Sequence, residues 1–356
     1  MTPPSAIRWH KRLPMPLSKL VGGWYCIREC GWHYTWHHFW GKVGRFLNAR
    51  GIMTGLAEKL CAYAHELHYY QFRSLDGLSA VPPAYGRDAV SGTWRGVLAR
   101  SPVRRVAVIA LYSRDGWVSA AQVELVRGVA EAADRLVVSG DCLLEPDEAR
   151  KLLPFATAVV CERHGEYDFG SYRRGVALAR REGWLDGAEL ADLVLVNDAS
   201  YGPIYPLEGV FRRMARDACD FWGQTSYAKD GCKHVQSYFY VFRRSVIASG
   251  AIGEFLDTVG GRKSRQEVID TYELGFTRFL EGRGFTWRTL VPYGKVPYNP
   301  CTRPLTLLTK YKVPFVKRKA MIGECDEDPR LTLGRISRVN GRVAGIIRSQ
   351  SIDFVL

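Results

Sequence analysis

The sequence lacks long apolar runs. None approaches the roughly 20 residues that a helix needs to cross a bilayer. The first 19 residues hold basic residues and prolines but no apolar centre, so we do not expect a secretory signal there. The nine cysteines are odd in number and lack the spacing of a disulfide framework. These absences predict reduced thiols and a cytoplasmic protein, with attachment to the inner face of the cell membrane left open.

Acidic residues are also in short supply. Asp and Glu number 36 against 50 Lys and Arg, which gives a net charge of +14. This excess favours a polyanionic partner, and nucleic acid, an anionic membrane face and a phosphorylated substrate all fit. Nucleic acid is the least favoured of the three, because the excess is spread along the chain and no nucleic-acid-binding motif is present. Hydrophobic residues make up 47% of the chain, which is typical of a globular protein.

The chain divides into three zones by composition. Residues 1–100 form a basic, aromatic-rich extension with a predicted helix near residues 56–72. Its tryptophans suit the membrane interface, but they equally suit an aromatic helical layer packed on the rest of the protein. Several side chains there could bind zinc, but their spacing is not that of structural zinc sites. These are Cys26, Cys30, His33, His37 and His38. Residues 323–356 form a basic C-terminal tail with a weakly alternating pattern.

Residues 101–322 alternate between strand and helix patterns. The predicted strands are residues 106–112, 136–139, 158–160 and 193–196, and the predicted helices between them are residues 119–133, 146–153 and 169–181. Ser119 and Gln122 have the spacing of a capping box. A further strand, 237–242, and a helix, 266–281, follow. This order predicts an α/β fold with a largely parallel sheet, whose ligands bind beyond the carboxyl ends of its strands.

Polar residues follow the predicted strands where those strands end. Ser139 ends one strand, Arg163 and Asp168 follow another, and Asn197-Asp198 follow a third. Carboxylates at a strand end can bind a divalent cation that holds a diphosphate, and an arginine can bind phosphate directly. The grouping therefore suggests a site for a nucleoside diphosphate. The alternative is that the two aspartates are ordinary turn or helix-cap residues.

Several motifs occur in an order that resembles the rhamnan synthesis protein F family. They are Arg163-His-Gly-Glu-Tyr-Asp-Phe-Gly-Ser-Tyr172, Val194-Leu-Val-Asn-Asp-Ala-Ser-Tyr-Gly-Pro-Ile204, Phe221-Trp-Gly-Gln-Thr225, His234-Val-Gln-Ser-Tyr-Phe239, Tyr272-Glu273 and Val313-Pro-Phe-Val-Lys317. Any one motif is weak, but their order and spacing over residues 104–319 are specific. The resemblance implies a GT-A-like, Rossmann-type sheet flanked by helices. It also implies a glycosyltransferase that builds rhamnose-containing cell-surface polysaccharide, with dTDP-L-rhamnose as donor and a glycan or lipid-linked glycan as acceptor.

The resemblance assigns donor-side roles. Asp198, with Asn197, faces the sugar diphosphate directly or through Mg²⁺ or Mn²⁺, so Asp198 is both a catalytic candidate and a metal-ligand candidate. Arg163 binds phosphate, while Asp168 and Ser139 help to hold the donor. Tyr201-Gly202-Pro203 makes a tight turn that lets the backbone approach the donor.

The acceptor side is assigned to later segments. Trp222, His234, Gln236 and Ser237 are expected to contact the acceptor or the sugar, and the alternative for the polar ones is that they are buried strand residues with local hydrogen bonds. An inverting transfer needs a general base opposite the diphosphate. Glu273 is the candidate, with Asp270 one turn earlier as the substitute. The alternative for Glu273 is a solvated helix carboxylate.

Three positions depart from the pattern of the family. His164 stands where Asn is common, Ala199 stands where Ser is common, and Asn197-Asp-Ala is not an Asp-x-Asp motif. The last departure leaves a metal requirement open. Together they keep alive a different function, that of a glycosyltransferase-like scaffold without activity.

Overall fold

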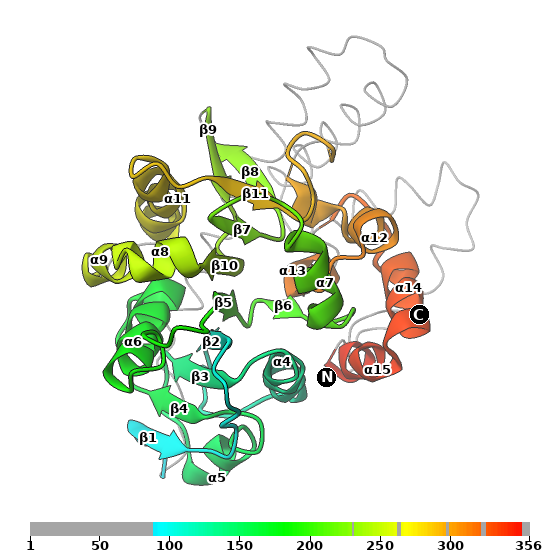
Figure 1. The fold of residues 1–356 in the computed structure, drawn as a ribbon. Helices are drawn as coiled ribbons and strands as arrows, with labels where there is room; N and C mark the ends of the chain where they lie inside the picture. The colour runs from blue at the N-terminus through cyan, green and yellow to red at the C-terminus, as the bar shows by residue number, and fades with distance from the viewer. Residues whose placement is uncertain (1–87, 230, 262–264, 297–298, 322–324, 351–356) are drawn as a thin grey trace, which may run out of the picture. The chain divides into compact units, whose positions relative to one another are not determined.

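A computed structural model describes residues 88–229, 231–261, 265–296, 299–321 and 325–350 (Figure 1). The expected aromatic extension, with its predicted helix and its Cys and His residues, lies almost entirely outside this part of the chain. Among the helices of the described ranges, none is both long and apolar enough to cross a membrane.

An eight-stranded sheet organises the described residues, and its strand order is β1-β4-β3-β2-β5-β10-β7-β11. β2, β3, β4 and β5 run parallel as neighbours, β7 and β11 are also parallel, and β1 and β10 are antiparallel to their neighbours. The strand bounds are β1 Gly92–Arg95, β2 Arg105–Leu111, β3 Arg135–Gly140, β4 Ala158–Cys161, β5 Asp192–Asn197, β7 Phe221–Gly223, β10 Phe239–Arg243 and β11 Trp287–Thr289. The predicted α/β class with a mostly parallel sheet is therefore confirmed.

Helices cover both faces of the sheet (Figure 1). On one face lie α4 (Ala120–Ala130), α5 (Pro146–Arg150), α7 (Leu207–Met214), α14 (Pro329–Val339) and α15 (Gly341–Gln350). On the other lie α6 (Tyr167–Arg181), α8 (Arg244–Ala248), α9 (Ala251–Asp257), α10 (Arg265–Val268) and α11 (Leu274–Glu281). The central strands are buried on both faces, which explains why they read as continuous apolar runs.

The predicted capping box at the start of α4 is present. The Ser119 side chain accepts a hydrogen bond from the backbone of Gln122, and the Gln122 side chain accepts one from the backbone of Ser119. This arrangement satisfies two backbone groups that a helix start otherwise leaves without partners.

The sheet reverses direction between β2 and β5. From β2 the chain proceeds to β3 and β4 on one side, and then returns to β5 on the other side of β2. The chain therefore leaves β2 and β5 toward opposite sides of the sheet, and ligands of α/β folds bind at the carboxyl ends of strands at such a point. Asp198 follows β5 at this point, and Tyr112 follows β2.

The second half of the sheet is built differently. A hairpin of β8 (Ser226–Lys229) and β9 (Cys232–Val235) leads into β10. The predicted helix 266–281 is present but contains a π-helical segment, η4 (Ile269–Glu273), between α10 and α11. π-Helical segments are rare in proteins, and those that occur are often found at functional sites.

A small two-stranded sheet joins distant segments. β6 (Ser200–Tyr201) pairs antiparallel with β12 (Val316–Lys317), so Lys317 lies opposite Ser200. Between β11 and β12 lie η5 (Pro300–Thr302), α12 (Pro304–Thr306) and the π-helical η6 (Leu307–Tyr311), and α13 (Arg318–Met321) follows β12.

The C-terminal residues differ from expectation. The stretch 335–348, which reads as weakly alternating, forms parts of the helices α14 and α15, and their apolar residues Ile336, Val343 and Ile347 join the core. The alternating pattern did not indicate helices because α14 and α15 each bury only a few apolar residues along one side. β1 likewise belongs to the sheet although it precedes residue 101. The division into 1–100, 101–322 and 323–356 stays a prediction.

Candidate functional site

Asp198 lies at the carboxyl end of β5, beside the end of β2. Its Oδ2 accepts hydrogen bonds from the Tyr112 backbone N–H at 3.1 Å and from Gln122 Nε2 at 2.7 Å. Burial raises the pKa of this carboxyl group, and the nearby Arg318 guanidinium and the two hydrogen bonds partly offset that effect. Gln122 therefore has two functions, since its Oε1 belongs to the capping box and its Nε2 holds Asp198.

Asn197 links the end of β5 to the start of α6. Asn197 Nδ2 donates to Asp168 Oδ2 at 2.7 Å, and Asn197 Oδ1 accepts from the Ala199 backbone N–H at 3.3 Å. The predicted meeting of these strand-end residues is thus observed for Asp168, Asn197 and Asp198. Ala199 takes part through its backbone alone, so the departure to alanine at this position breaks none of these contacts.

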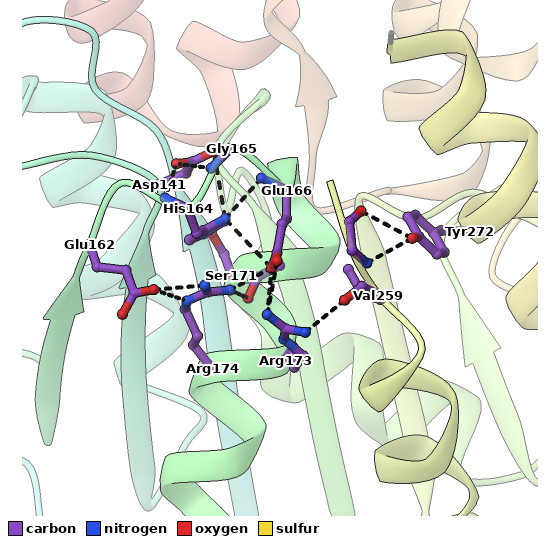
Figure 2. Close-up of polar contacts among 12 residues, drawn as sticks. Asp141, Glu162, His164, Gly165, Glu166, Ser171, Arg173, Arg174, Val259 and Tyr272 are labelled. Atoms are coloured by element: carbon purple, nitrogen blue, oxygen red, sulfur yellow. Dashed lines mark hydrogen bonds and ion pairs between the residues drawn. The ribbon is translucent and has the colours of Figure 1, made fainter. Parts of the chain in front are cut away.

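The loop between β4 and α6 is fixed by a polar network (Figure 2). Asp141 Oδ1 accepts from the backbone N–H groups of His164 and Gly165, at 2.9 and 3.0 Å. The His164 ring is enclosed, with Nδ1 accepting from the Glu166 backbone and Nε2 lying 3.1 Å from Ser171 Oγ. Burial lowers the pKa of His164, as expected of a neutral ring in such a position. The second departure, His164, therefore organises the loop.

The same network reaches the acceptor half of the site. Glu166 pairs with Arg173 and Arg174, and Arg173 Nη1 donates to Val259 O at 2.6 Å (Figure 2). The Tyr272 hydroxyl bonds both backbone groups of Gly260. Since Tyr272 precedes Glu273, these contacts tie the position of η4 to that of α6.

Arg163 stands at the start of this loop and is exposed. The backbone of its neighbour His164 is held by Asp141. The phosphate-binding role of Arg163 remains a proposal.

Glu273 ends the π-helical segment η4 and faces the start of β10. Glu273 Oε1 accepts from the Ser237 backbone N–H at 3.1 Å and lies 3.9 Å from His234 Nε2. Its side chain is 16% exposed, whereas Asp270 is an exposed residue. Glu273 is therefore not a solvated helix carboxylate, and of the two candidates it is the one that faces the sheet end.

The polar residues around β9 and β10 differ in their surroundings. Gln236 belongs to an internal network, because its Oε1 accepts from Thr225 Oγ1 at 2.8 Å and from Cys301 Sγ at 3.2 Å. Ser237 offers its backbone N–H to Glu273 and its carbonyl to the Tyr172 hydroxyl. His234 is 3% exposed and stands beside Glu273. For Gln236 the alternative of a buried strand residue describes the observed contacts best.

Two of the expected site residues lie in the core. Trp222 is 1% exposed and packs edge-to-face against Phe211 and Phe239, so it offers no surface to a sugar. Ser139 is completely enclosed, and its hydroxyl has no hydrogen-bond partner among the described residues. The expectation that these two side chains contact the ligand was therefore wrong. A residue on a strand next to the site can still point its side chain into the core.

The Tyr201-Gly202-Pro203 turn packs closely against another segment of the chain. Gly202 has φ +143°, and a Cβ there would lie 2.4 Å from Pro314 O. The Ile204 N–H also donates to Pro314 O at 2.7 Å. The close backbone approach that the glycine permits is therefore to the segment that leads into β12, and an approach of this turn to the donor stays a prediction.

Sequence reasoning missed two cations, Lys317 at the end of β12 and Arg318 at the start of α13. Arg318 N donates to Ala199 O at 3.0 Å, and its guanidinium lies 5.4 Å from the Tyr201 ring centroid. Lys317 Nζ lies 4.2 Å from the Tyr238 ring centroid, and burial lowers the pKa of this lysine. Asp168 and Glu273 both raise the pKa of Lys317, so carboxylates from both sides of the site act on it. The run Lys317-Arg318-Lys319 at the end of the last shared motif was the available signal.

The carboxylate of Asp198 is held by groups of the protein itself. Oδ2 of Asp198 already accepts two N–H groups, Asn197 turns its amide nitrogen toward Asp168, and a guanidinium stands nearby. Within the described ranges, no three His, Cys, Asp or Glu side chains are grouped as metal ligands. Mg²⁺ is usually held by one or two carboxylates together with substrate phosphates, so a cation that binds with the donor stays a prediction.

Remote likenesses to solved structures exist. A 4-diphosphocytidyl-2C-methyl-D-erythritol synthase is 15% identical, with a TM-score of 0.34, over 53% of this chain and 89% of that one. The synthase of the same title from Anaerococcus prevotii DSM 20548 is 8% identical, with a TM-score of 0.27, over 48% and 84%. S. aureus TarS 1-349 is 11% identical, with a TM-score of 0.27, over 71% and 75%. Likenesses this remote leave the function to be argued from the chain itself.

The family comparison is more specific. No curated protein matches this chain. Residues 136–340 match the family described as rhamnan synthesis protein F, and this range is more than half of the chain and includes the strand ends, η4 and β12. The chain therefore belongs to the rhamnan synthesis protein F family.

Proposed function

We propose that the protein is an inverting rhamnosyltransferase with a GT-A-like architecture. It moves L-rhamnose from dTDP-β-L-rhamnose onto a glycan acceptor during the synthesis of cell-surface polysaccharide. Membership in a family of rhamnan synthesis supports a glycosyltransferase-type function. The sugar, the nucleotide and the direction of attack are the finer parts of the proposal.

One observation carries the proposal. The pairing of β12 with β6 places Lys317 opposite Ser200, directly after Asn197-Asp198, and Asp168 and Glu273 both oppose the lowering of its pKa by burial. Asp168 belongs to the donor side through Asn197, and Glu273 belongs to the acceptor side through Ser237. Carboxylates from the two halves of the sheet are thus held at the edge of the sheet where ligands of α/β folds bind.

The residues suggest a single displacement. The acceptor hydroxyl oxygen attacks C1 of rhamnose while Glu273 takes its proton, the bond from C1 to the diphosphate oxygen breaks, and dTDP leaves with the bonding electrons. Both described contacts of Glu273 are made by Oε1, so we assign Oε2 as the proton acceptor. Asp198, held by Gln122 and Tyr112, would bind a hydroxyl of the donor sugar.

A thermal-shift panel tests this function. The full chain is heated with dTDP-, UDP- and GDP-sugars, each with and without Mn²⁺. A ligand that binds the native state raises the melting temperature, so dTDP-L-rhamnose should give the largest shift. If no nucleotide sugar raised the melting temperature, the proposed glycosyltransferase activity would be rejected and the scaffold function would be favoured. A larger shift with UDP- or GDP-sugars would change the donor but keep the reaction class.

The acceptor would be a growing glycan on a lipid carrier. Such an acceptor places the enzyme at the inner face of the cell membrane, and the net charge of +14 suits an anionic surface. Flotation with anionic liposomes, at low and at high salt, tests this attachment. Binding to neutral liposomes alone would contradict the electrostatic basis.

A further inference from the structure

We propose that Lys317 and Arg318 form a subsite for a diphosphate, and that this pair of cations makes a divalent metal dispensable for donor binding. The proposal deepens the proposed function and rests on it for the identity of the diphosphate as that of a nucleotide sugar. Its charge argument stands on the residues themselves.

The pairing of β6 with β12 places both residues. Lys317 lies opposite Ser200 in register, and the Arg318 backbone donates to Ala199 O at 3.0 Å. Ser200 and Ala199 directly follow Asn197-Asp198. The two cations are therefore fixed by backbone hydrogen bonds beside the residues that end β5.

The Arg318 side chain has unmet hydrogen-bonding capacity. Its Nε and Nη2 atoms are enclosed and have no hydrogen-bond partner among the described residues. Its ring contact with Tyr201, 5.4 Å from the centroid, orients the guanidinium without satisfying its N–H groups. Enclosed donors without partners are costly, and a guanidinium matches phosphate oxygens in geometry and charge. A diphosphate would satisfy these donors.

Lys317 supplies the second charge. It is half-buried, and its Nζ lies 4.2 Å from the Tyr238 ring centroid, which holds the ammonium group by a cation–π contact. Burial lowers the pKa of Lys317, and Asp168 and Glu273 oppose this effect and favour its charged form. A cation there stabilises the negative charge that grows on the diphosphate as it leaves, which is the task of a metal ion in other sites.

The surroundings of Asp198 also favour a diphosphate that is held by the two cations and not by a metal ion. In the described part of the chain no three potential ligands are grouped, and Asp198 Oδ2 is occupied by two N–H donors. Asn197 stands where a second carboxylate would be needed. Lys317 and Arg318 therefore supply the positive charge that a diphosphate needs where a second carboxylate for a metal ion is missing.

Isothermal titration of the full chain with inorganic pyrophosphate and with dTDP, both in EDTA, tests the subsite. We expect wild-type protein to bind both ligands, and added Mg²⁺ or Mn²⁺ to change the dissociation constants by less than about threefold. Arg318→Gln and Lys317→Gln should each weaken binding by at least about tenfold, which is typical of losing a charged hydrogen bond. Arg338→Gln, an equal loss of charge at an exposed residue of α14, is the matched control and should bind as wild type.

The outcomes separate this subsite from the proposed function. Binding that appears only with a divalent cation, or variants that bind pyrophosphate as wild type does, would overturn the subsite. Pyrophosphate binding that depends on both residues, with no response to any nucleotide sugar, would keep the subsite and reject the proposed function. Melting temperatures of the free variants check folding. Arg318→Lys, which keeps the charge, should retain part of the binding that Arg318→Gln loses.

Discussion

The two halves of the sheet present their polar residues in different ways. In the β2–β5 half the strands are parallel, and Asp168, Asn197 and Asp198 meet because carboxyl ends of parallel strands share one edge. In the β7–β11 half the strands are mixed, and Glu273 reaches the same edge from a π-helical segment. In the proposed reaction, the half with parallel strands would hold the donor and the half with mixed strands would supply the base.

The largest expected effect comes from the half with mixed strands. Glu273→Gln should lower the rate of sugar transfer by about 10²–10⁴-fold, the range for a lost general base, while the dissociation constant for dTDP stays within about twofold. Rates and titrations on the same preparation provide the measurement. Asp270→Asn, one turn earlier and exposed, is the control. If Glu273→Gln transferred sugar at nearly the wild-type rate, Glu273 would not be the general base.

Asp198→Asn tests the half with parallel strands. The amide oxygen can still accept from Gln122 and Tyr112, but the negative charge facing the donor is lost, so we expect transfer to fall by about 10²-fold. Because burial raises the pKa of Asp198, the charged form is disfavoured in the fold, and the variant should not lose thermal stability. Asp217→Asn, at an exposed residue, is the control. A large loss of melting temperature would make Asp198 a structural residue.

Gly202→Ala tests the close packing between the β6 segment and the segment that leads into β12. A Cβ would lie 2.4 Å from Pro314 O at φ +143°, so the segment leading to β12 must move, at a cost of about 1–3 kcal/mol in the free energy of unfolding. Urea denaturation measures this cost. Gly209→Ala, in α7 with open space around it, should instead gain up to about 1 kcal/mol. Equal effects of the two substitutions would show that the approach to Pro314 is not needed.

The smallest expected effect is a pH dependence of diphosphate binding. Burial lowers the pKa of Lys317 from its ordinary 10.5, although Cys301, Glu273 and Asp168 oppose the shift. The bound diphosphate requires the charged form, so affinity should fall as pH rises through this lowered pKa, earlier than for an ordinary lysine. Titrations of pyrophosphate across alkaline pH measure the fall, and Lys317→Arg should remove it. An identical pH profile for Lys317→Arg would assign the titration to another group.

The sequence predicted one half of this site better than the other. Asp168, Asn197 and Asp198 follow strands whose apolar runs are unmistakable, and parallel order alone brings strand ends together. The expectations for Trp222 and Ser139 were wrong because both side chains are buried. The sequence pattern of a strand does not show which of its faces a helix covers. Lys317 and Arg318 were missed because β12 is two residues long and pairs with a strand more than a hundred residues earlier. Such pairing leaves no local pattern.

The anomeric form of the first product tests the central claim most directly. The full chain is incubated with dTDP-β-L-rhamnose without acceptor, and slow transfer to water is followed by proton NMR before the free sugar can mutarotate. A single displacement with Glu273 as base predicts α-L-rhamnose as the first sugar formed, in equal amount to dTDP, and no such turnover by Glu273→Gln. β-L-rhamnose as the first product, or turnover that survives Glu273→Gln, would contradict the account.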